Sequence, residues 1–289
     1  MPNALGGGMF YERFFAGDDY FQRISSEHAF QALTESSKPS TAHRTGIYLS
    51  QVTERGDERR FHLLRCSTNL SGPTENFCAT DREIVAALNA EADKRYPGHA
   101  PLNHVLAQIY RHVGTSKAKI SSHADKTKDM PENGIMAFCT FYDGRGKLDD
   151  KYEHKGKTGL TKLRFVPKAA GDAFTVTLAP SSVFFMPLSV NRDYTHEIQP
   201  SILPTELLPI RLGYVVRCSK TVAVHRDGQT YLERGDELVP LEPPTPDGVA
   251  ELRRLYADEN RTTARIDYGD RFRFSLNEGD YKAPDLKRA

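Results

Sequence analysis

The chain has 289 residues, which is enough for one large domain or two small ones. Hydrophobic residues make up 38% and charged residues 27%, so a sizeable core is possible and a disordered tail is excluded. Lys and Arg number 39 against 38 Asp and Glu, a balance that argues against a strongly basic nucleic-acid binder but leaves room for a local basic patch.

No window of about 18 apolar residues occurs, so we expect no membrane span and no membrane partner. The first ten residues lack the basic and apolar regions of a secretory signal. The four cysteines are scattered without a C-x-x-C pair, which predicts free thiols in a reducing compartment. We therefore expect an intracellular, cytoplasmic protein, and a nuclear location stays open.

The first segment, 1–80, is expected to form an N-terminal wrap with lid-like strands. Aromatic residues cluster between 10 and 21, a polar loop is expected at 35–46, and strands are expected at 47–52 and 61–66. A helix is predicted for 81–95, because apolar residues recur there at helical spacing and Thr80 with Glu83 matches a capping box.

The middle of the chain has the pattern of an antiparallel sandwich or jelly roll. Short strands are predicted at 104–110, 118–123, 134–142, 173–179, 182–187, 194–199 and 210–218, and 143–172 is interpreted as a polar insertion. We assign 81–218 to this β core. The remainder, 219–289, is predicted to be an extension packed on the core, with a hairpin turn at Asp227-Gly228 and a helix near 247–257.

A possible metal site begins with His123 and Asp125 at the end of a predicted strand. Residues i and i+2 of a strand point to the same face, and His196 lies on another predicted strand. Two His and one carboxylate form the facial triad that binds Fe(II) and leaves positions open for O₂ and a cosubstrate. The alternative is that these are ordinary core or surface residues. A second H-x-D triplet, at His225, is interpreted as part of a hairpin turn.

Two arginines, Arg211 and Arg217, lie six residues apart on one apolar strand and so share a face. Guanidinium groups on such a face are costly unless each meets an anion, and a dicarboxylate would satisfy them. The alternative is an edge strand on which both side chains point to solvent.

The order of these motifs resembles the AlkB-like branch of the Fe(II)/2-oxoglutarate dioxygenases. That branch shows N-x-x-L-x-x-x-Y, then I-x-x-H-x-D, a later His, and R-x-N-x-T-x-R. The matching residues lie within 80–218 and are Asn103, Leu106, Tyr110, Ile120, His123, Asp125, His196, Arg211 and Arg217. The resemblance implies a mainly β (α+β) fold, a double-stranded β-helix of the jelly-roll or cupin type with buttressing helices.

The resemblance also implies roles. His123, Asp125 and His196 would bind Fe(II) and serve catalysis, with 2-oxoglutarate as cosubstrate and O₂ as oxidant. Arg211 would hold the distal carboxylate of 2-oxoglutarate, Tyr110 would hydrogen-bond the cosubstrate, and Arg217 would complete its pocket. Gln108 stands where the family has Asn and can still offer an amide. Gly213 and Val215 depart from the family Asn and Thr.

The favoured reaction is hydroxylation or related oxidation of a C–H bond of a small molecule, with release of succinate and CO₂. The near-neutral charge supports this, as does the tail 218–289, which holds 12 Lys and Arg against 14 Asp and Glu. The alternative is oxidative demethylation of methylated nucleic-acid bases, gripped through the basic insertion 143–168. An alternative of another class is a non-catalytic iron-binding or interaction module. No substrate-binding residue is predicted.

Overall fold

The computed structural model describes residues 2–286 except 18, 35–40, 67–69 and 145–151. A large sheet has the order β1 (Asn3–Leu5), β2 (Gly8–Tyr11), β15 (Ser182–Pro187), β10 (Ile135–Tyr142), β17 (Arg211–Arg217), β8 (His104–Tyr110), β4 (Thr41–Ser50) and β3 (Gln31–Thr34), and β7 (Glu75–Asn76) pairs with β4. A small sheet has the order β14 (Phe174–Thr177), β13 (Lys162–Pro167), β16 (Tyr194–Gln199) and β9 (Ile120–His123).

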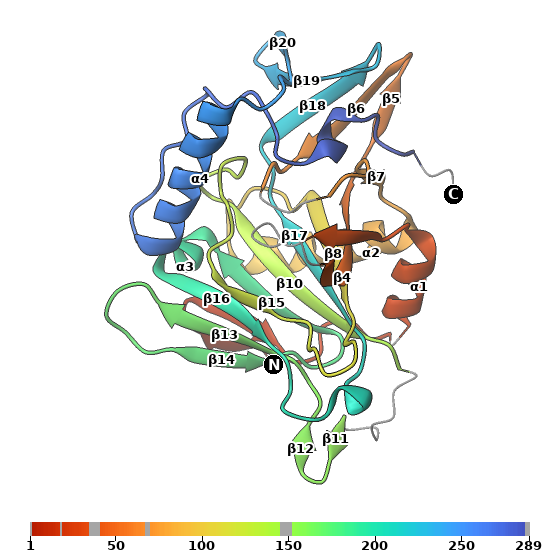
Figure 1. Cartoon of the computed structure of the whole chain (residues 1–289), viewed down its shortest axis with the longest axis vertical. Coiled ribbons are helices and arrows are strands. Elements are labelled where there is room, and N and C mark those ends of the chain that lie inside the picture. Colours follow the sequence, from red (N-terminus) through yellow and green to blue (C-terminus); the bar gives the residue numbers. More distant parts are fainter. Residues whose placement is uncertain (1, 18, 35–40, 67–69, 145–151, 287–289) are drawn as a thin grey trace.

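Apart from the separate hairpin β11–β12, the chain from β8 to β17 crosses between these two sheets, with β13 and β14 as consecutive strands of the small sheet. Figure 1 shows the two sheets. In the large sheet, β8, β17, β10 and β15 are neighbours, and in the small sheet β9, β16, β13 and β14 are neighbours. All these pairings are antiparallel. This order is that of a jelly roll, or double-stranded β-helix, so the predicted fold class is confirmed.

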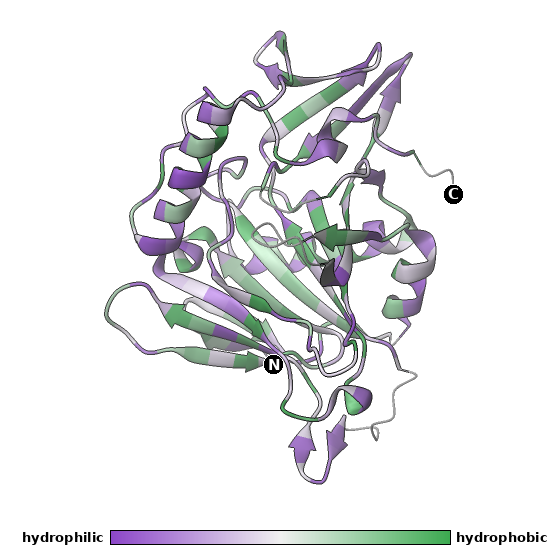
Figure 2. Cartoon of the chain, viewed as in Figure 1, coloured by the Kyte–Doolittle hydropathy of each residue, from purple (hydrophilic) through white to green (hydrophobic). Residues whose placement is uncertain are grey.

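Both faces of the large sheet are covered, which explains why every residue of β8 and β10 is buried. Alternate residues such as Leu106 and Phe138 face the small sheet and pack with Leu163 and Phe165. The residues between them pack on the other side, against α1 (Tyr20–Glu27) and α2 (Ala79–Arg95). Figure 2 shows the resulting hydrophobic residues along the central strand β10.

Helix α2 begins earlier than predicted, and its cap differs from the prediction. The side chain of Asp81 accepts a hydrogen bond of 2.7 Å from the backbone N–H of Cys78, which is the N-cap residue. The predicted capping box of Thr80 and Glu83 is therefore wrong. Thr80 is buried inside the first turn, where its hydroxyl donates to Glu27.

Two other boundaries differ from the sequence prediction. Strand β13 lies within the stretch interpreted as an insertion, because Leu163 and Phe165 are fully buried while basic residues alternate with them. Strand β4 begins within the predicted loop 35–46, whose residues 35–40 lie outside the described part. The hairpin at Asp227-Gly228 is confirmed, and both residues have positive φ, 50° and 75°, as a tight turn of this kind requires.

A third sheet joins the two ends of the chain. Its order is β20 (Glu237–Pro240), β19 (Gln229–Arg234), β18 (Thr221–Arg226), β6 (Glu58–Leu63) and β5 (Thr53–Arg55). The remaining elements are the hairpin β11 (Glu153–His154) and β12 (Lys157–Thr158), α3 (Leu188–Asp193), α4 (Pro246–Arg261), and the 3₁₀ turns Thr205–Leu207 and Glu278–Tyr281. The division into 1–80, 81–218 and 219–289 stays a prediction. No helix in the described ranges has the length and apolar character to cross a membrane.

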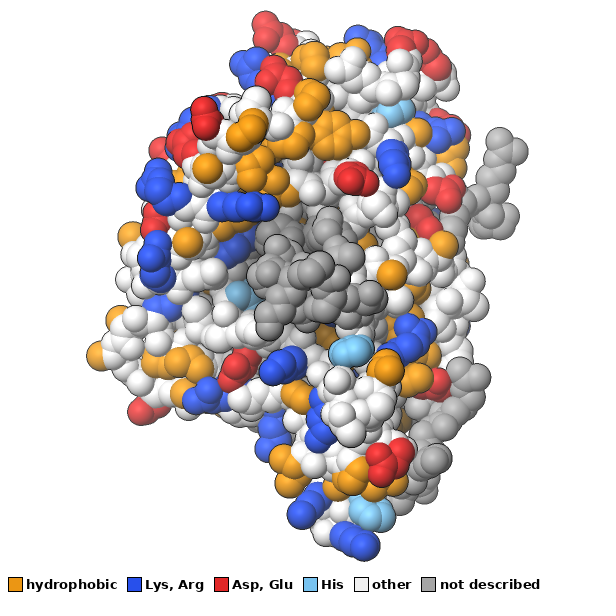
Figure 3. Space-filling model, in the orientation of Figure 1, with side chains coloured by type: hydrophobic (Ala, Val, Ile, Leu, Met, Phe, Trp, Pro, Cys, Tyr) orange, Lys and Arg blue, Asp and Glu red, His pale blue; other side chains and the backbone are white. Residues whose placement is uncertain are grey.

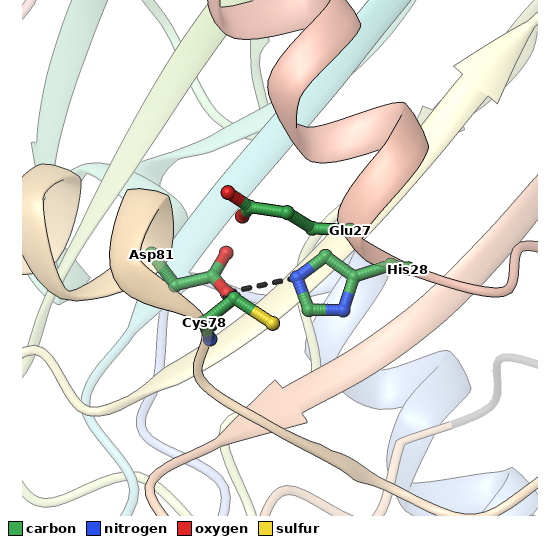
Figure 4. Close-up of side chains that lie close together, drawn as sticks. All are labelled: Glu27, His28, Cys78 and Asp81. Carbon is green, nitrogen blue, oxygen red and sulfur yellow. Dashed lines mark hydrogen bonds and ion pairs between the residues drawn. The ribbon is translucent and has the colours of Figure 1, made fainter. Parts of the chain in front are cut away.

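A buried cluster of charged side chains ties α1 and α2 to the large sheet. Figure 4 shows Glu27 and His28 at the end of α1, close to Cys78 and Asp81 at the start of α2. The imidazole of His28 is bonded at Nδ1 to Glu75, at 2.9 Å, and at Nε2 to Asp81, at 2.8 Å.

Both ring nitrogens of His28 are thus engaged by carboxylates, so the ring is a doubly donating imidazolium and offers no lone pair to a metal. Burial alone would lower the pKa of His28, but the bonds to Asp81 and Glu75 outweigh it and raise the pKa to about 9. The cluster is therefore interpreted as a structural ion pair rather than a metal site.

We predict that His28→Gln lowers the free energy of unfolding by about 3 kcal/mol below pH 6.5. The folded pKa lies above the unfolded value of about 6.5, so the contribution is complete below that pH and is lost as the pH rises through 9. Urea denaturation of both proteins between pH 6 and 9.5 measures the difference. A difference that does not shrink with rising pH would contradict the charged state assigned to His28.

Candidate metal centre and cavity

Strands β9 and β16 bring two predicted ligands face to face. His123 and His196 are direct cross-strand partners, and their ring centroids lie 4.5 Å apart. Asp125 follows just after β9, with its Oδ1 atom 3.9 Å from Nε2 of His123. One ligand atom from each of the three residues lies within 4.8 Å of the others, so the triad could hold one metal ion.

The protonation of this triad suits metal binding. Nδ1 of His123 donates to the carbonyl of Ser121 at 2.9 Å, which leaves the lone pair on Nε2, the nitrogen near Asp125. Burial, followed by the proximity of His123, lowers the pKa of His196 to about 3. Burial also lowers the pKa of His123. Both imidazoles are therefore neutral at pH 7, the form that a metal requires.

Asp125 is held by an ion pair that the sequence did not predict. The Arg217 guanidinium donates to Oδ1 of Asp125 at 3.0 Å, and both groups are buried. Burial would raise the pKa of Asp125, but Arg217 and the two histidines outweigh it and hold the pKa at about 2. The other oxygen, Oδ2, is buried without a hydrogen-bond partner, as expected for an atom that awaits a cation.

Two asparagines fix the backbone that carries these ligands. The side chain of Asn191, on α3, accepts from the N–H of Asp125 at 2.8 Å and donates to its carbonyl at 3.0 Å. The side chain of Asn260, on α4, accepts from the N–H of Ala124 at 2.8 Å. Lys168 donates to backbone carbonyls of both helices and so connects them, side by side in Figure 1. The C-terminal extension thus holds the segment between the first two ligands.

Arg211 lies buried on the same face of the large sheet as Arg217, at the other end of β17. Its guanidinium carbon is 4.0 Å from the ring centroid of Tyr110, and its Nε and one terminal nitrogen are buried without a partner. The predicted alternative, in which Arg211 points to solvent, is therefore excluded. Within the described ranges no carboxylate pairs with this guanidinium, and a buried charge of this kind favours an anionic partner.

Gly213 explains how Arg211 fits. A Cβ atom at Gly213 would lie 2.9 Å from a terminal nitrogen of Arg211 and 3.2 Å from the Tyr110 ring. The glycine that departs from the family pattern therefore makes room for the guanidinium to lie along its own strand. Tyr110 donates its hydroxyl to Gln108 at 3.0 Å, so these two predicted cosubstrate residues contact each other.

The triad and the arginines line one cavity of about 200 Å³ between the two sheets. Its wall contains all seven residues predicted for the site: His123, Asp125, His196, Arg211, Arg217, Tyr110 and Gln108. Lys126, one of the lysines that surround the metal motif in the sequence, also lines it, and so does Arg44, which sequence reasoning missed. Arg44 could have been found only by recognising β4, since its register places Arg44 beside Tyr110.

Several basic residues that flank the metal motif or belong to the insertion are engaged within the protein. Lys128 forms a buried ion pair with Asp129 at 3.1 Å, and Lys126 donates to Tyr256 and Asn260. In the insertion 143–168, Arg164 pairs with Glu197. Three further basic residues of the insertion, Arg145, Lys147 and Lys151, lie outside the described part of the chain. On the face drawn in Figure 3, Lys and Arg side chains are scattered among acidic and neutral ones.

The chain matches no protein-family model, and no curated protein matches its sequence. Among solved structures, one described as "The structure of OsALKBH1" is similar with a TM-score of 0.45 and 13% sequence identity. The similarity covers 75% of this chain and 100% of that chain. At this level it carries no conclusion about function, and the jelly-roll fold rests on the strand order described above.

We predict that Gly213→Ala folds normally but weakens 2-oxoglutarate binding by about tenfold, because the added methyl group displaces the tip of Arg211. Calorimetric titration of the metal-loaded protein under anaerobic conditions measures the affinity. Gly144→Ala is the control, since Gly144 is exposed and has nothing within 4 Å of its added carbon. Unchanged affinity for 2-oxoglutarate in Gly213→Ala would contradict the assignment of Arg211 as a cosubstrate-binding residue.

Proposed function

We propose that the protein is an Fe(II)/2-oxoglutarate-dependent dioxygenase that oxidises a C–H bond of a small molecule. The observation that carries the proposal is the convergence of His123, Asp125 and His196 in one cavity that also contains Arg211. Two neutral imidazoles and one carboxylate are the donor set that Fe(II) takes in this class of oxygenase. Arg211 supplies the charge that an oxo-diacid needs.

The residues fit both implied groups. For the metal, the fit is seen in the unpartnered Oδ2 atom of Asp125 and the lone pair left on His123. For the cosubstrate, it is seen in the unpartnered nitrogens of Arg211, which lie in the same cavity wall as the triad. The unpaired Arg211 guanidinium and the unpartnered oxygen of Asp125 are costly to bury, and 2-oxoglutarate and Fe(II) would supply their partners.

When bound, Fe(II) and 2-oxoglutarate supply O₂ activation and C–H oxidation, with succinate and CO₂ as products. The chain itself contributes position and charge. Arg217 orients Asp125 and keeps it ionised, while Ser121 fixes the tautomer of His123. Arg211 would hold the distal carboxylate of the cosubstrate. The hydroxyl of Tyr110 would have to turn from Gln108 to donate to that carboxylate. Apolar neighbours such as Leu163 and Phe138 exclude water from the cavity.

A small-molecule substrate is supported by how the basic residues are used. Lys126 and Lys128, which flank the metal motif, are committed to internal bonds and are not available to grip phosphates. Lys168, at the end of the basic insertion, is committed in the same way. A nucleic-acid enzyme needs a continuous set of phosphate contacts, so these commitments favour a smaller substrate. Base demethylation remains the alternative.

We predict that His123→Ala and Asp125→Ala each lower 2-oxoglutarate-dependent succinate release and Fe(II) affinity by at least about a hundredfold. Each substitution removes one of three metal donors. His225→Ala is the matched control, since His225 stands in the second H-x-D triplet, where it bonds to Thr230 on the third sheet. Succinate assays and anaerobic Fe(II) titration give the two readouts. Full turnover in both ligand variants would show that the metal lies elsewhere.

We predict that a single-stranded oligonucleotide binds weakly, with little dependence on salt, because Lys126, Lys128 and Lys168 are committed to internal bonds. The demethylase alternative predicts the opposite, since each phosphate contact releases counter-ions and steepens the loss of affinity with salt. Fluorescence anisotropy of a labelled twelve-nucleotide strand between about 50 and 200 mM salt measures the slope. Tight binding with a steep slope would favour the alternative and count against a small substrate.

A further inference from the structure

A second arginine faces the cavity across Tyr110 from Arg211. Arg44 on β4 lies directly opposite Tyr110 on β8, and Tyr110 lies opposite Arg211 on β17. Cross-strand partners share a face of the sheet, so both arginines belong to the cavity side. The Nε atom of Arg44 is buried and has no hydrogen-bond partner. No ion pair to Arg44 is formed by any carboxylate in the described part of the chain.

Arg44 also lines a second depression, which Arg211 does not. It lines a neighbouring depression of about 510 Å³ together with His43, Lys117, Lys119 and Pro200. Lys117 makes one bond there, from its ammonium to the carbonyl of Ser201 at 2.8 Å, and two of its donors remain. Arg44 therefore stands between the cavity that contains the triad and a depression whose charged side chains are basic.

The charges around this depression are of one sign. Burial lowers the pKa of nearby His112 to about 4, and Lys117, Arg211 and His43 lower it further in the same direction. Of the cavity cations, Arg217 is neutralised by Asp125, and Arg211 is taken by the proposed cosubstrate. Among the three arginines of this wall, Arg44 is the one that neither Asp125 nor 2-oxoglutarate uses, and its half-buried guanidinium, with Nε fully buried, favours an oxyanion.

We propose that Arg44, with Lys117 and Lys119, forms a subsite for an anionic group of the oxidised small molecule, a carboxylate or a phosphate. That the bound anion belongs to the substrate rests on the proposed function, whereas the existence of an anion site does not. The subsite would anchor the substrate at the mouth of the cavity and direct its uncharged part toward the triad. Placement on the opposite side of Tyr110 from Arg211 separates this anion from the distal carboxylate of the cosubstrate.

The test compares Arg44→Gln with Arg211→Gln and with the control Arg55→Gln, a change at an exposed strand arginine of the third sheet. Thermal denaturation first establishes that each variant folds. Inorganic phosphate and acetate are titrated by NMR line broadening into metal-free protein, and 2-oxoglutarate is titrated anaerobically into Fe(II)-loaded protein. The metal-free arm needs no turnover, so it stands even if the proposed oxygenase activity fails.

We expect Arg44→Gln to weaken phosphate or acetate binding by at least about tenfold and to leave 2-oxoglutarate binding unchanged. Arg211→Gln should weaken 2-oxoglutarate binding, and Arg55→Gln should weaken neither. The stronger of the two probes identifies the anionic group. Equal phosphate and acetate binding in wild type and Arg44→Gln would overturn the subsite. Loss of 2-oxoglutarate affinity in Arg44→Gln equal to that in Arg211→Gln would assign Arg44 to the cosubstrate instead. Tight oligonucleotide binding that Arg44→Gln abolishes would overturn the claim that the anionic group belongs to a small molecule.

Discussion

The antiparallel pairing of β9 with β16 places His123 directly opposite His196, and the site depends on this register. A shift by one residue would turn one imidazole to the other face of the small sheet and separate the pair. Asp125 belongs to the segment that leaves β9, and its position is set by Arg217 from the opposite sheet. The jelly roll therefore matters to the chemistry because it brings the facing sides of the two sheets to a common cavity.

The extensions on either side of the β core contribute to the same centre. Asn260 on α4 holds the backbone at Ala124, between two ligands, and Arg65 from the N-terminal segment forms a buried ion pair of 2.7 Å with Asp129. The loop that carries Asp125 is thus bonded to residues from both ends of the chain. Such contacts fix ligand orientation before any metal arrives, which lowers the entropic cost of binding.

Much of the fold and of the candidate site could be predicted because it depends on local pattern. Alternation of apolar residues indicates the core strands, and the H-x-D spacing indicates that His123 and Asp125 act together, although Asp125 lies just after β9. The partners of these residues were not predictable, since asparagines such as Asn191 act through single hydrogen bonds and leave no periodic signal. Strand β13 was missed because basic residues alternate with its two buried ones and resemble a solvated loop.

The role of Arg44 could not be predicted from its local sequence either. Its surroundings in the sequence are polar and contain Gly46, which suggested a loop, and only the register of β4 against β8 reveals that it faces the cavity. Gly213 likewise departs from the family motif in sequence, and its role in leaving space for the guanidinium of Arg211 follows only from the structure. A residue that leaves space for a neighbour, or a buried polar group without a partner, can be recognised only in the three-dimensional structure.

The central claim is that three side chains from β9, the loop after it and β16 bind one Fe(II) ion beside an arginine that anchors an oxo-diacid. A crystal structure of the complete chain, grown anaerobically with Fe(II) and 2-oxoglutarate, tests it most directly. The account predicts iron bound by His123, Asp125 and His196, with the far carboxylate of the cosubstrate paired to Arg211. Iron at other residues, or a cosubstrate bound away from Arg211, would contradict it.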